Sequence, residues 1–396
     1  MKKSPPLLTV MIISYNNGNF LFETLESTLA QDYENMELII SDDCSEQFFD
    51  AEKIIDYINV RRTDRLKRVI INENERNLGT VRHLEFIRPM ARGELELVIA
   101  ADDVWHDSHV FSALVERMEE LGPDAEWLVS QMEMCDENLD KTESLFVPDD
   151  VVQMIEKKQY EELLNKEVTG SFLPSSSCMY RRSFYNKIKN LSEYYCLIED
   201  YTSHLRGLST GIPIYYLNRI SVRHRSGGIS HGNLRNGNIG MEKFYRDLYR
   251  TFELEIAPIR DRLNASAYRI AQENYLCHQA CYEKLHIQEI PQSPPTLIKK
   301  KSLCLHQCRA ELYRIKPTLL RISGVEFMKK TVAVLLCFLF SAALLQQSRW
   351  LETSTPGCVL LRTLIILLFL FLFGQFLLNC LLKLWEKSGV HRGESL

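Results

Sequence analysis

The sequence predicts an α/β fold in which helices cover a parallel sheet. Over residues 7–101, short apolar runs alternate with amphipathic segments in the order strand, helix, strand, helix, strand, helix, strand. Hydrophobic residues make up 45% of the 396 residues and charged residues 25%, which is typical of a folded core and excludes disorder as the main state. Three of the four strands end on polar residues: Tyr15-Asn16, Asp42-Asp43 and Asp102-Asp103.

The expected elements follow in order along the chain. The apolar run Leu7–Ile13 is too short for a signal peptide and lacks a small-residue cleavage site, so we interpret it as a buried strand. Further strands are expected over 36–41, 69–72, 95–101, 126–134, 171–180 and 213–221. Helices are expected over 20–30, 49–60 and 80–91, from Glu199-Asp200 onward, and over much of 241–290. Three prolines mark a linker at 291–295.

Charge and cysteine content limit the possible partners and compartments. The net charge is −5, so a strongly basic nucleic-acid binder is excluded and we expect no nucleic-acid partner. The 11 cysteines form no regular framework, which favours a reducing, cytoplasmic environment. Residues 299–330 nevertheless carry nine Lys and Arg against two Glu. Because this block precedes an apolar segment, we interpret it as a surface for anionic membrane lipids, although a merely solvated face is the alternative.

The C-terminal region contains two apolar segments that predict membrane helices. Residues 363–382 form a run of 20 residues, which matches the roughly 20 that a bilayer crossing needs, whereas 331–345 is shorter. We therefore expect a membrane helix over 361–383 and a possible second over 331–350, with both ends in the cytoplasm by the positive-inside rule. Buried helices of a globular part are the alternative, and a stronger one for the first segment.

Three pairs of acidic residues are candidates for metal binding and acid–base catalysis. Asp42-Asp43 and Asp102-Asp103 end strands, and Glu199-Asp200 begins a helix about 100 residues later. In parallel sheets, ligands bind beyond the carboxyl ends of the strands. One pair holding a divalent metal would let that metal bridge a diphosphate, and a further carboxylate could act as general base on a hydroxyl. A turn or a helix cap explains any single pair, but not three at matching positions.

Five segments together resemble the successive motifs of family 2 glycosyltransferases with the GT-A fold. They are Thr9–Ser27 (TVMIISYNNGNFLFETLES), Glu37–Ser45 (ELIISDDCS), Asn74–Arg82 (NERNLGTVR), Leu97–Trp105 (LVIAADDVW) and Glu199-Asp200. The resemblance covers about residues 7–235. It implies a Rossmann-like nucleotide-diphospho-sugar transferase domain that moves a sugar to an acceptor hydroxyl with inversion at the anomeric carbon.

The resemblance also implies roles for individual residues. Asp200 resembles the catalytic base, with Glu199 beside it. Asp103 and Asp102 resemble the aspartates that contact the metal, Mg²⁺ or Mn²⁺, and the ribose. The remaining nucleotide-sugar contacts that it implies are Ile13, Ser14, Tyr15, Asn16, Asp42, Asp43, Arg82, His224 and Arg225. One departure is Ala100, which stands where the metal motif commonly has its first aspartate. The protein would therefore supply fewer metal ligands, and phosphate and water would supply more of them.

We therefore expect a membrane-anchored, metal-dependent hexosyltransferase of bacterial cell-envelope polysaccharide synthesis. Residues 1–240 would form the GT-A domain, 241–328 a helical basic neck and 329–396 the membrane region. The donor would be a nucleotide-diphosphate sugar, with UDP favoured. The acceptor would be a polyprenyl-diphosphate-linked glycan of capsule, O-antigen or exopolysaccharide. The location would be the inner, cytoplasmic membrane with the catalytic domain in the cytoplasm. Two alternatives stay open: a polyprenyl-phosphate glycosyltransferase like dolichyl-phosphate mannose synthase, and a non-catalytic nucleotide-sugar-binding scaffold.

Overall fold

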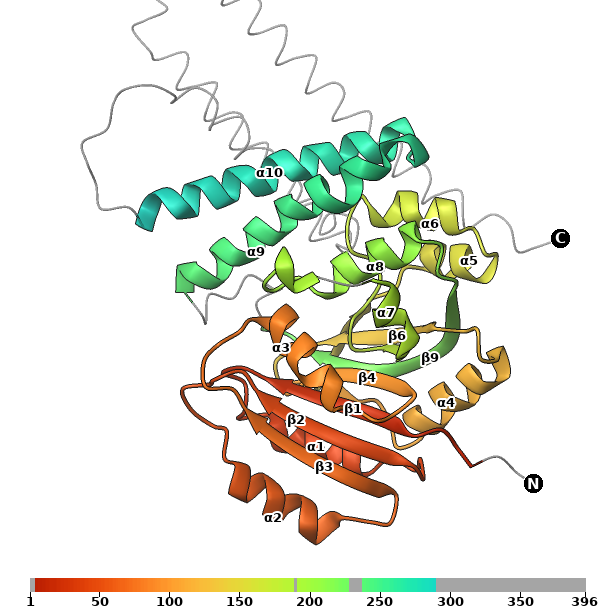
Figure 1. The fold of residues 1–396 in the computed structure, drawn as a ribbon, viewed down its shortest axis with the longest axis vertical. Helices are drawn as coiled ribbons and strands as arrows, with labels where there is room; N and C mark the ends of the chain where they lie inside the picture. The colour runs from red at the N-terminus through yellow and green to blue at the C-terminus, as the bar shows by residue number, and fades with distance from the viewer. Residues whose placement is uncertain (1–3, 189–190, 228–236, 290–396) are drawn as a thin grey trace, which may run out of the picture. The chain divides into compact units, whose positions relative to one another are not determined.

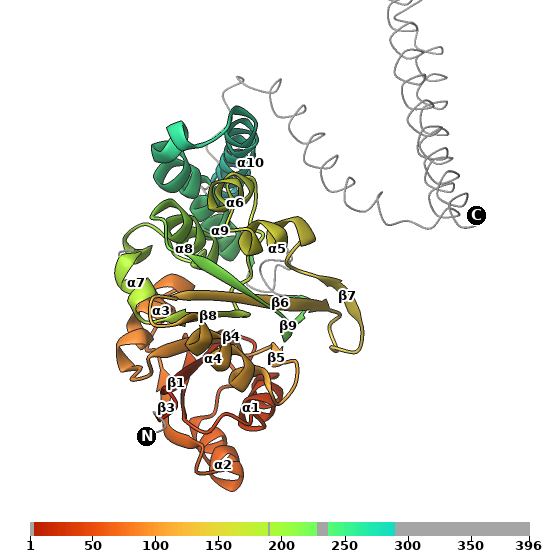
Figure 2. The same cartoon turned by 90° about the vertical axis from the view of Figure 1, so that its right-hand side faces the viewer.

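The described part of the chain is built on a nine-stranded mixed sheet (Figures 1 and 2). The computed structural model describes residues 4–188, 191–227 and 237–289. The strand order is β3-β2-β1-β4-β8-β6-β9-β5, with β7 paired to β6. The strands are β1 (Leu8–Ser14), β2 (Met36–Asp42), β3 (Leu66–Glu73), β4 (Leu95–Ala100), β5 (Val104–Trp105), β6 (Trp127–Cys135), β7 (Thr142–Leu145), β8 (Cys178–Arg181) and β9 (Ile214–Arg225).

Helices connect these strands and cover both faces of the sheet. The α-helices before the last strand are α1 (Leu21–Leu29), α2 (Ala51–Arg61), α3 (Thr80–Ile87), α4 (Val110–Leu121), α5 (Asp149–Glu156), α6 (Tyr160–Glu167), α7 (Ser183–Lys187) and α8 (Asp200–Ser209). After it come α9 (Gly237–Thr251), the π-helix η5 (Phe252–Ile256), the 3₁₀ helix η6 (Ala257–Arg262) and α10 (Ala265–Glu289). Short 3₁₀ helices are η1 (Arg88–Met90) and η2 (Leu191–Glu193). The α/β fold predicted from the sequence is confirmed for these residues.

The first four strands are parallel, and their carboxyl ends are level. β1 pairs with β2 and β4, and β2 pairs with β3. Ser14 lies opposite Asp42, and Ile13 lies opposite Ala100. The polar residues that follow these strands therefore meet at one edge of the sheet, as the sequence predicts. This edge forms one side of the functional site.

The alternation of side chains in β1 divides the core into two layers. Leu8, Val10 and Ile12 are fully buried in a cluster with residues of α1, α2 and α4. Met11, which points the other way, is buried in a second cluster with Leu84 and Ile87 of α3. Because every residue of a central parallel strand faces a helix layer, the strand reads as a continuous apolar run.

A further core lies between β6 and the later helices. Trp127 is fully buried and packs against Phe184 and His204, at ring-centroid distances of 5.4 and 5.1 Å. Burial lowers the pKa of His204 to about 3, so this imidazole is neutral, and its Nε2 lies 2.9 Å from the Tyr180 hydroxyl. Gly207 leaves room for Trp127, because a Cβ there would come within 3.0 Å of the indole.

Helices after the sheet complete this same core. Phe252, Ile256 and Ala271 are buried in the cluster around Trp127. The Glu255 carboxylate is held by Arg206 of α8, with Nη2 at 2.8 Å, and by the Tyr195 hydroxyl at 2.8 Å. Figures 1 and 2 show α9 and α10 beyond α8, on the side away from α1 and α2. The helical structure expected over 241–290 is found as far as Glu289, and these helices share one compact unit with the sheet. The domain boundary at 240 stays a prediction.

One predicted strand differs from the structure. The strand expected over 171–180 begins only at Cys178, because Pro174 and three serines favour a turn, in which the Cys178 amide donates to the Ser175 carbonyl. Within the described residues, no helix has both the length and the apolarity that a membrane crossing requires. The membrane segments predicted over 331–350 and 361–383, and residues 290–328 of the predicted neck, lie outside the described residues.

Candidate active site

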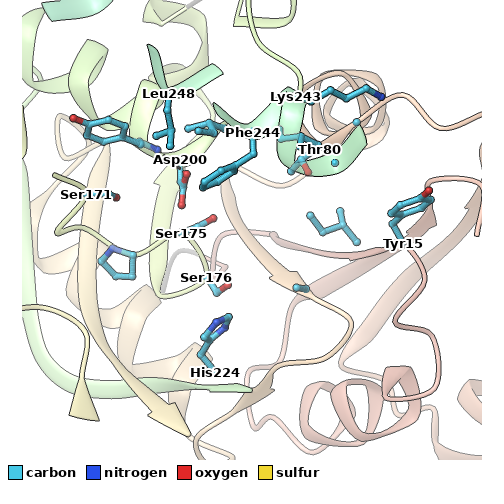
Figure 3. Close-up of a pocket in the computed structure, with 18 of the residues that line it drawn as sticks. Tyr15, Thr80, Ser171, Ser175, Ser176, Asp200, His224, Lys243, Phe244 and Leu248 are labelled. Atoms are coloured by element: carbon cyan, nitrogen blue, oxygen red, sulfur yellow. Dashed lines mark hydrogen bonds between the residues drawn. The ribbon is translucent and has the colours of Figure 1, made fainter. Parts of the chain in front are cut away.

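A cavity of about 920 Å³ opens between the carboxyl edge of the parallel strands and the later helices (Figure 3). Its polar half comes from the segments after β1, β2 and β4 and from β9. The other half comes from the 168–176 loop, α9, η5 and α10. Residues that line the polar half include Ile13, Ser14, Tyr15, Asn16, Asn17, Asp43, Asp102, Asp103 and His224. Residues that line the other half include Val168, Ser171, Pro174, Lys243, Phe244, Leu248, Phe252, Ile256, Ala271 and Tyr275.

The segment after β1 forms a turn that reaches Asp102. The Asn17 Oδ1 accepts the Ser14 hydroxyl at 3.1 Å and the Tyr15 amide at 3.0 Å. The Asn17 Nδ2 donates to Asp102 at 3.0 Å. Asn16 takes a positive φ of 56°, which asparagine tolerates better than most residues. The structure thus places the predicted contacts Ile13, Ser14, Tyr15 and Asn16 on the cavity and adds Asn17, which the sequence argument missed.

The two aspartates at the end of β2 have different surroundings. Asp43 lines the cavity, and its carboxylate accepts the amides of Leu78 and Gly79, both at 2.8 Å, at the start of α3. Asp42 instead caps the turn that follows it, because its oxygens accept the amide and the hydroxyl of Ser45, both at 2.6 Å. Asp42 is not among the cavity-lining residues, so the contact expected from it is corrected to a turn-capping role.

The buried Asp103 and the partly buried Asp102 and His224 form a polar group at the base of the cavity. The His224 Nδ1 lies 2.9 Å from Asp103 Oδ1, which also accepts the Arg225 amide at 3.0 Å. Burial opposes the charge on His224, but the Asp103 carboxylate outweighs it and raises the pKa of the imidazole. Burial, together with the charge of Asp103, raises the pKa of Asp102 to about 6. Negative charge is therefore concentrated at this point of the cavity.

Arg225 does not face the cavity. Its guanidinium donates to the Asp102 carbonyl at 2.9 Å, to the Glu137 carbonyl at 2.7 Å and to the Glu23 carboxylate at 2.6 Å. The same group lies over the ring of Phe20, and the side chain is almost fully buried. The ligand contact expected from Arg225 is thus corrected. Its side chain ties β9 to the Asp102 loop and to α1.

Asp200, the expected base, stands in the cavity at the first turn of α8. Figure 3 shows its carboxylate beside Phe244 and Leu248, with Ser175 and Ser176 below it. Its Oδ1 accepts the Tyr201 amide at 2.7 Å. Burial raises the pKa of Asp200 to about 6; the Tyr201 amide lowers it, and the charge of Glu199 raises it by less than the amide lowers it.

Glu199 points away from Asp200 and the cavity. Its Oε1 lies 2.7 Å from Nη2 of Arg88, and only 7% of the residue is exposed. The catalytic role expected from Glu199 is therefore corrected: the side chain is half of a buried ion pair. Arg82 lies on the surface, donates to the Ser192 carbonyl at 3.4 Å and is not among the cavity-lining residues, so its contact with the nucleotide stays a prediction.

The sequence argument did not find the wall made by α9, η5 and α10. Gly240, Phe244 and Leu248 lie four residues apart and so share a face of α9, and Lys243 lies beside that face. The same spacing is visible in the sequence. What the sequence does not show is that this face lines the cavity, because that depends on packing against α10 and η5 rather than on any local signal.

The polar end of the cavity fits a hard divalent cation. Among residues 4–188, 191–227 and 237–289, no group of three or more His, Cys, Asp or Glu side chains is arranged to hold a metal by itself. Mg²⁺, however, is usually held by one or two carboxylates together with substrate phosphates and water. Asp102 and Asp103 supply such a pair, and a cation would relieve the repulsion that raises the pKa of Asp102.

Comparison with known proteins gives the family. Residues 9–189 match the family described as Glycosyl transferase family 2. This part of the chain is a family 2 glycosyltransferase domain. Its α/β fold is GT-A-like, and the motif segments that carry the sequence resemblance up to Trp105 lie inside the matched range.

Individual relatives of the glycosyltransferase domain are distant. The amylovoran biosynthesis glycosyltransferase AmsB of Erwinia amylovora is 30% identical over 117 residues, which are 29% of this chain and 37% of AmsB. WcaA of Escherichia coli K12, a glycosyl transferase named for colanic acid biosynthesis, is 29% identical over 103 residues, 26% of this chain and 35% of WcaA. The chain thus spans little more than a third of these curated relatives. The crystal structure of Staphylococcus aureus TarS 1–349 shares 17% identity at a TM-score of 0.42, over 71% of this chain and 82% of that one.

Proposed function

We propose that this protein is an inverting glycosyltransferase that moves a sugar from a nucleotide-diphosphate donor to a hydroxyl of a lipid-linked bacterial glycan. One observation carries the proposal. The Asp200 carboxylate stands in the cavity between its polar edge and an apolar wall. A donor in the polar half and an acceptor along the wall would meet at this carboxylate.

The reaction requires a base that removes the acceptor proton as the hydroxyl attacks the anomeric carbon. One oxygen of Asp200 is fixed by the Tyr201 amide at 2.7 Å. A pKa of about 6 keeps the carboxylate ionised at neutral pH and makes it more basic than an exposed aspartate. Inversion follows from a single in-line displacement, in which the donor's diphosphate leaves on the side opposite the attacking oxygen.

The polar half suits the nucleotide diphosphate. Tyr15 offers an exposed ring for a base, and Asp43 fixes the start of α3 beside it. Asp102 and Asp103 would hold Mg²⁺ or Mn²⁺ there. When bound, this ion supplies positive charge to the departing diphosphate. His224, whose pKa is raised by Asp103, would place its imidazole at the same end. We favour a UDP-sugar as the donor.

The acceptor side supports a glycan carried by a lipid. Phe244, Leu248 and Phe252 present apolar and aromatic surface next to Asp200, which suits the apolar face of a sugar ring. The basic residues of 299–330 and the apolar runs 331–345 and 363–382 support attachment to the cytoplasmic membrane with the catalytic domain in the cytoplasm. The similarity to AmsB and WcaA supports a role in cell-envelope polysaccharide synthesis.

Donor binding provides the first test. We expect the purified protein to bind one nucleotide from a panel of UDP-, GDP- and dTDP-sugars more tightly with Mn²⁺ than without it. Asp102→Asn should weaken that binding by at least about tenfold, because a carboxylate ligand is lost. Asp102 is a cleaner test than Asp103, whose oxygens also hold His224 and the Arg225 amide.

Calorimetry with and without the metal measures this effect. Asp150→Asn is the matched control, since this aspartate pairs with Lys166 outside the cavity and should leave the affinity unchanged. A folded wild-type protein that binds no member of the panel would contradict the proposal.

The pKa of Asp200 predicts the pH profile. The base acts only when ionised, so turnover should be constant above about pH 7 and fall about tenfold per unit well below pH 6, where the carboxylate is protonated. Release of nucleoside diphosphate from the bound donor, measured between pH 4.5 and 8, checks this. A rate that stays flat through pH 6, while the far-ultraviolet circular dichroism is unchanged, is incompatible with Asp200 as the base.

A further inference from the structure

The peptide that precedes Asp200 is held by a carboxylate from α9. Asp247 is completely buried, and its Oδ2 accepts the backbone amides of Cys196 at 2.7 Å, Leu197 at 2.6 Å and Ile198 at 3.4 Å. These are three consecutive amides, immediately before Glu199 and Asp200. A carboxylate that gathers successive amides makes charge-assisted hydrogen bonds, which are shorter and stronger than neutral ones.

The same peptide is fixed on its other sides. The Cys196 carbonyl accepts the Val81 amide at 3.1 Å. The backbone of Gly79 approaches so closely that a Cβ there would lie 2.7 Å from the Cys196 carbonyl oxygen and 2.5 Å from its Sγ. The start of α3 and the buried face of α9 thus clamp residues 196–198 between them. Leu197 and Ile198 also line the cavity.

Asp200 is therefore restrained through the residues that precede it. After the clamped peptide comes Glu199, whose carboxylate is tied to Arg88 at 2.7 Å. The orientation of the Asp200 carboxylate thus depends on two charged groups that belong to neither α8 nor the sheet. Misplacing a reacting group by about 1 Å can lower a rate about 100-fold.

We propose that Asp247 is a positioning residue, which holds the 196–198 peptide so that Asp200 faces the attacking hydroxyl. The inference rests on the proposed function, because it assigns Asp247 a part in the same reaction. Asp247 touches neither half of the cavity. Its own carboxylate is balanced by the neighbouring Arg246, whose Nη2 lies 3.2 Å away.

The test compares Asp247→Asn with Glu37→Gln. Glu37 is a matched control because it too is buried and accepts two loop amides, those of Arg92 and Gly93, but it lies at the amino end of β2, opposite the cavity. Both variants exchange a buried carboxylate for the amide of the same size. The full-length protein is used with the nucleotide sugar that the panel identifies, and with water as acceptor.

We expect Asp247→Asn to lower the rate of donor hydrolysis about 10- to 100-fold while the donor Kd stays within about twofold. Amide hydrogen exchange should become faster at residues 196–198. Glu37→Gln should lose thermal stability without either effect. The inference is overturned if Asp247→Asn hydrolyses the donor at the wild-type rate. It is also overturned if the rate and the donor affinity of Asp247→Asn fall together, and Glu37→Gln shows the same two losses.

Asp200→Asn separates this inference from the proposed function. If Asp200→Asn hydrolyses the donor as fast as the wild type, the proposed function fails. If Asp200→Asn is inactive and Asp247→Asn is fully active, the assignment of the base stands and only the positioning role of Asp247 is wrong.

Discussion

Asp200→Asn is expected to lower sugar transfer by about 10²- to 10⁴-fold, the range over which a positioned general base contributes to a rate. Asparagine has the size of aspartate and can still accept the Tyr201 amide, so the start of α8 should keep its structure. It cannot take up a proton. The donor Kd, measured by calorimetry beside the rate, should therefore stay within about twofold.

Glu167→Gln is the matched control for this substitution. The Glu167 carboxyl is completely buried, and burial raises its pKa well above its usual range. The charge of Asp200 also raises this pKa. Glutamine has the same size as glutamate and preserves an acceptor for the Phe172 amide. Glu167→Gln should retain nearly full activity. Wild-type turnover in Asp200→Asn would remove the base from the proposal and favour a non-catalytic scaffold that binds nucleotide sugars.

Arg88→Met is expected to reduce the free energy of unfolding by about 3–5 kcal/mol, because it leaves buried carboxylates without their cation. The Arg88 guanidinium lies 2.7 Å from Glu199, 3.8 Å from Glu96 and 3.4 Å from the centre of the Tyr185 ring. Burial opposes its charge, but these neighbours raise its pKa, so it stays protonated. Urea denaturation followed by circular dichroism measures the loss.

Two further variants test the physical reason for the loss. Arg117→Met breaks an exposed pair with Glu120 on α4 and should change stability by less than about 1 kcal/mol. Arg88→Met combined with Glu199→Gln and Glu96→Gln removes the stranded charges and should recover much of the stability. If Arg88→Met and Arg117→Met lose stability to a similar extent, burial of the Arg88 ion pair does not increase the cost of breaking it.

The first half of the fold could be predicted from the sequence because its signals are local. β1, β2 and β4 are short apolar runs that end at polar residues, and the parallel pattern brings those ends together without any knowledge of packing. Asp43, Asp102, Asp103, His224 and Asp200 all line the cavity where the argument placed them. Their chemical roles remain predictions until the variants are measured.

Two predicted site residues point elsewhere because their side chains pair with residues that are distant in the sequence. Glu199 is taken up by Arg88, 111 positions earlier, and Arg225 by Glu23, 202 positions earlier. A carboxylate beside a catalytic aspartate looks the same in the sequence whether it faces a substrate or an arginine. The wall of α9 was missed for a related reason, since an amphipathic helix shows that one face is buried but not against what.

The burial of η5 and α10 residues in the Trp127 core has a practical consequence for dividing this protein into fragments. Phe252, Ile256, Leu263, Ala267 and Ala271 are buried there, although they lie after every strand of the described sheet. A protein cut near residue 240 would lack Asp247 and expose apolar surface on α8, which makes it prone to aggregate. The smallest piece that folds by itself must reach at least the buried part of α10. During synthesis, this core can close only after the ribosome has released that helix.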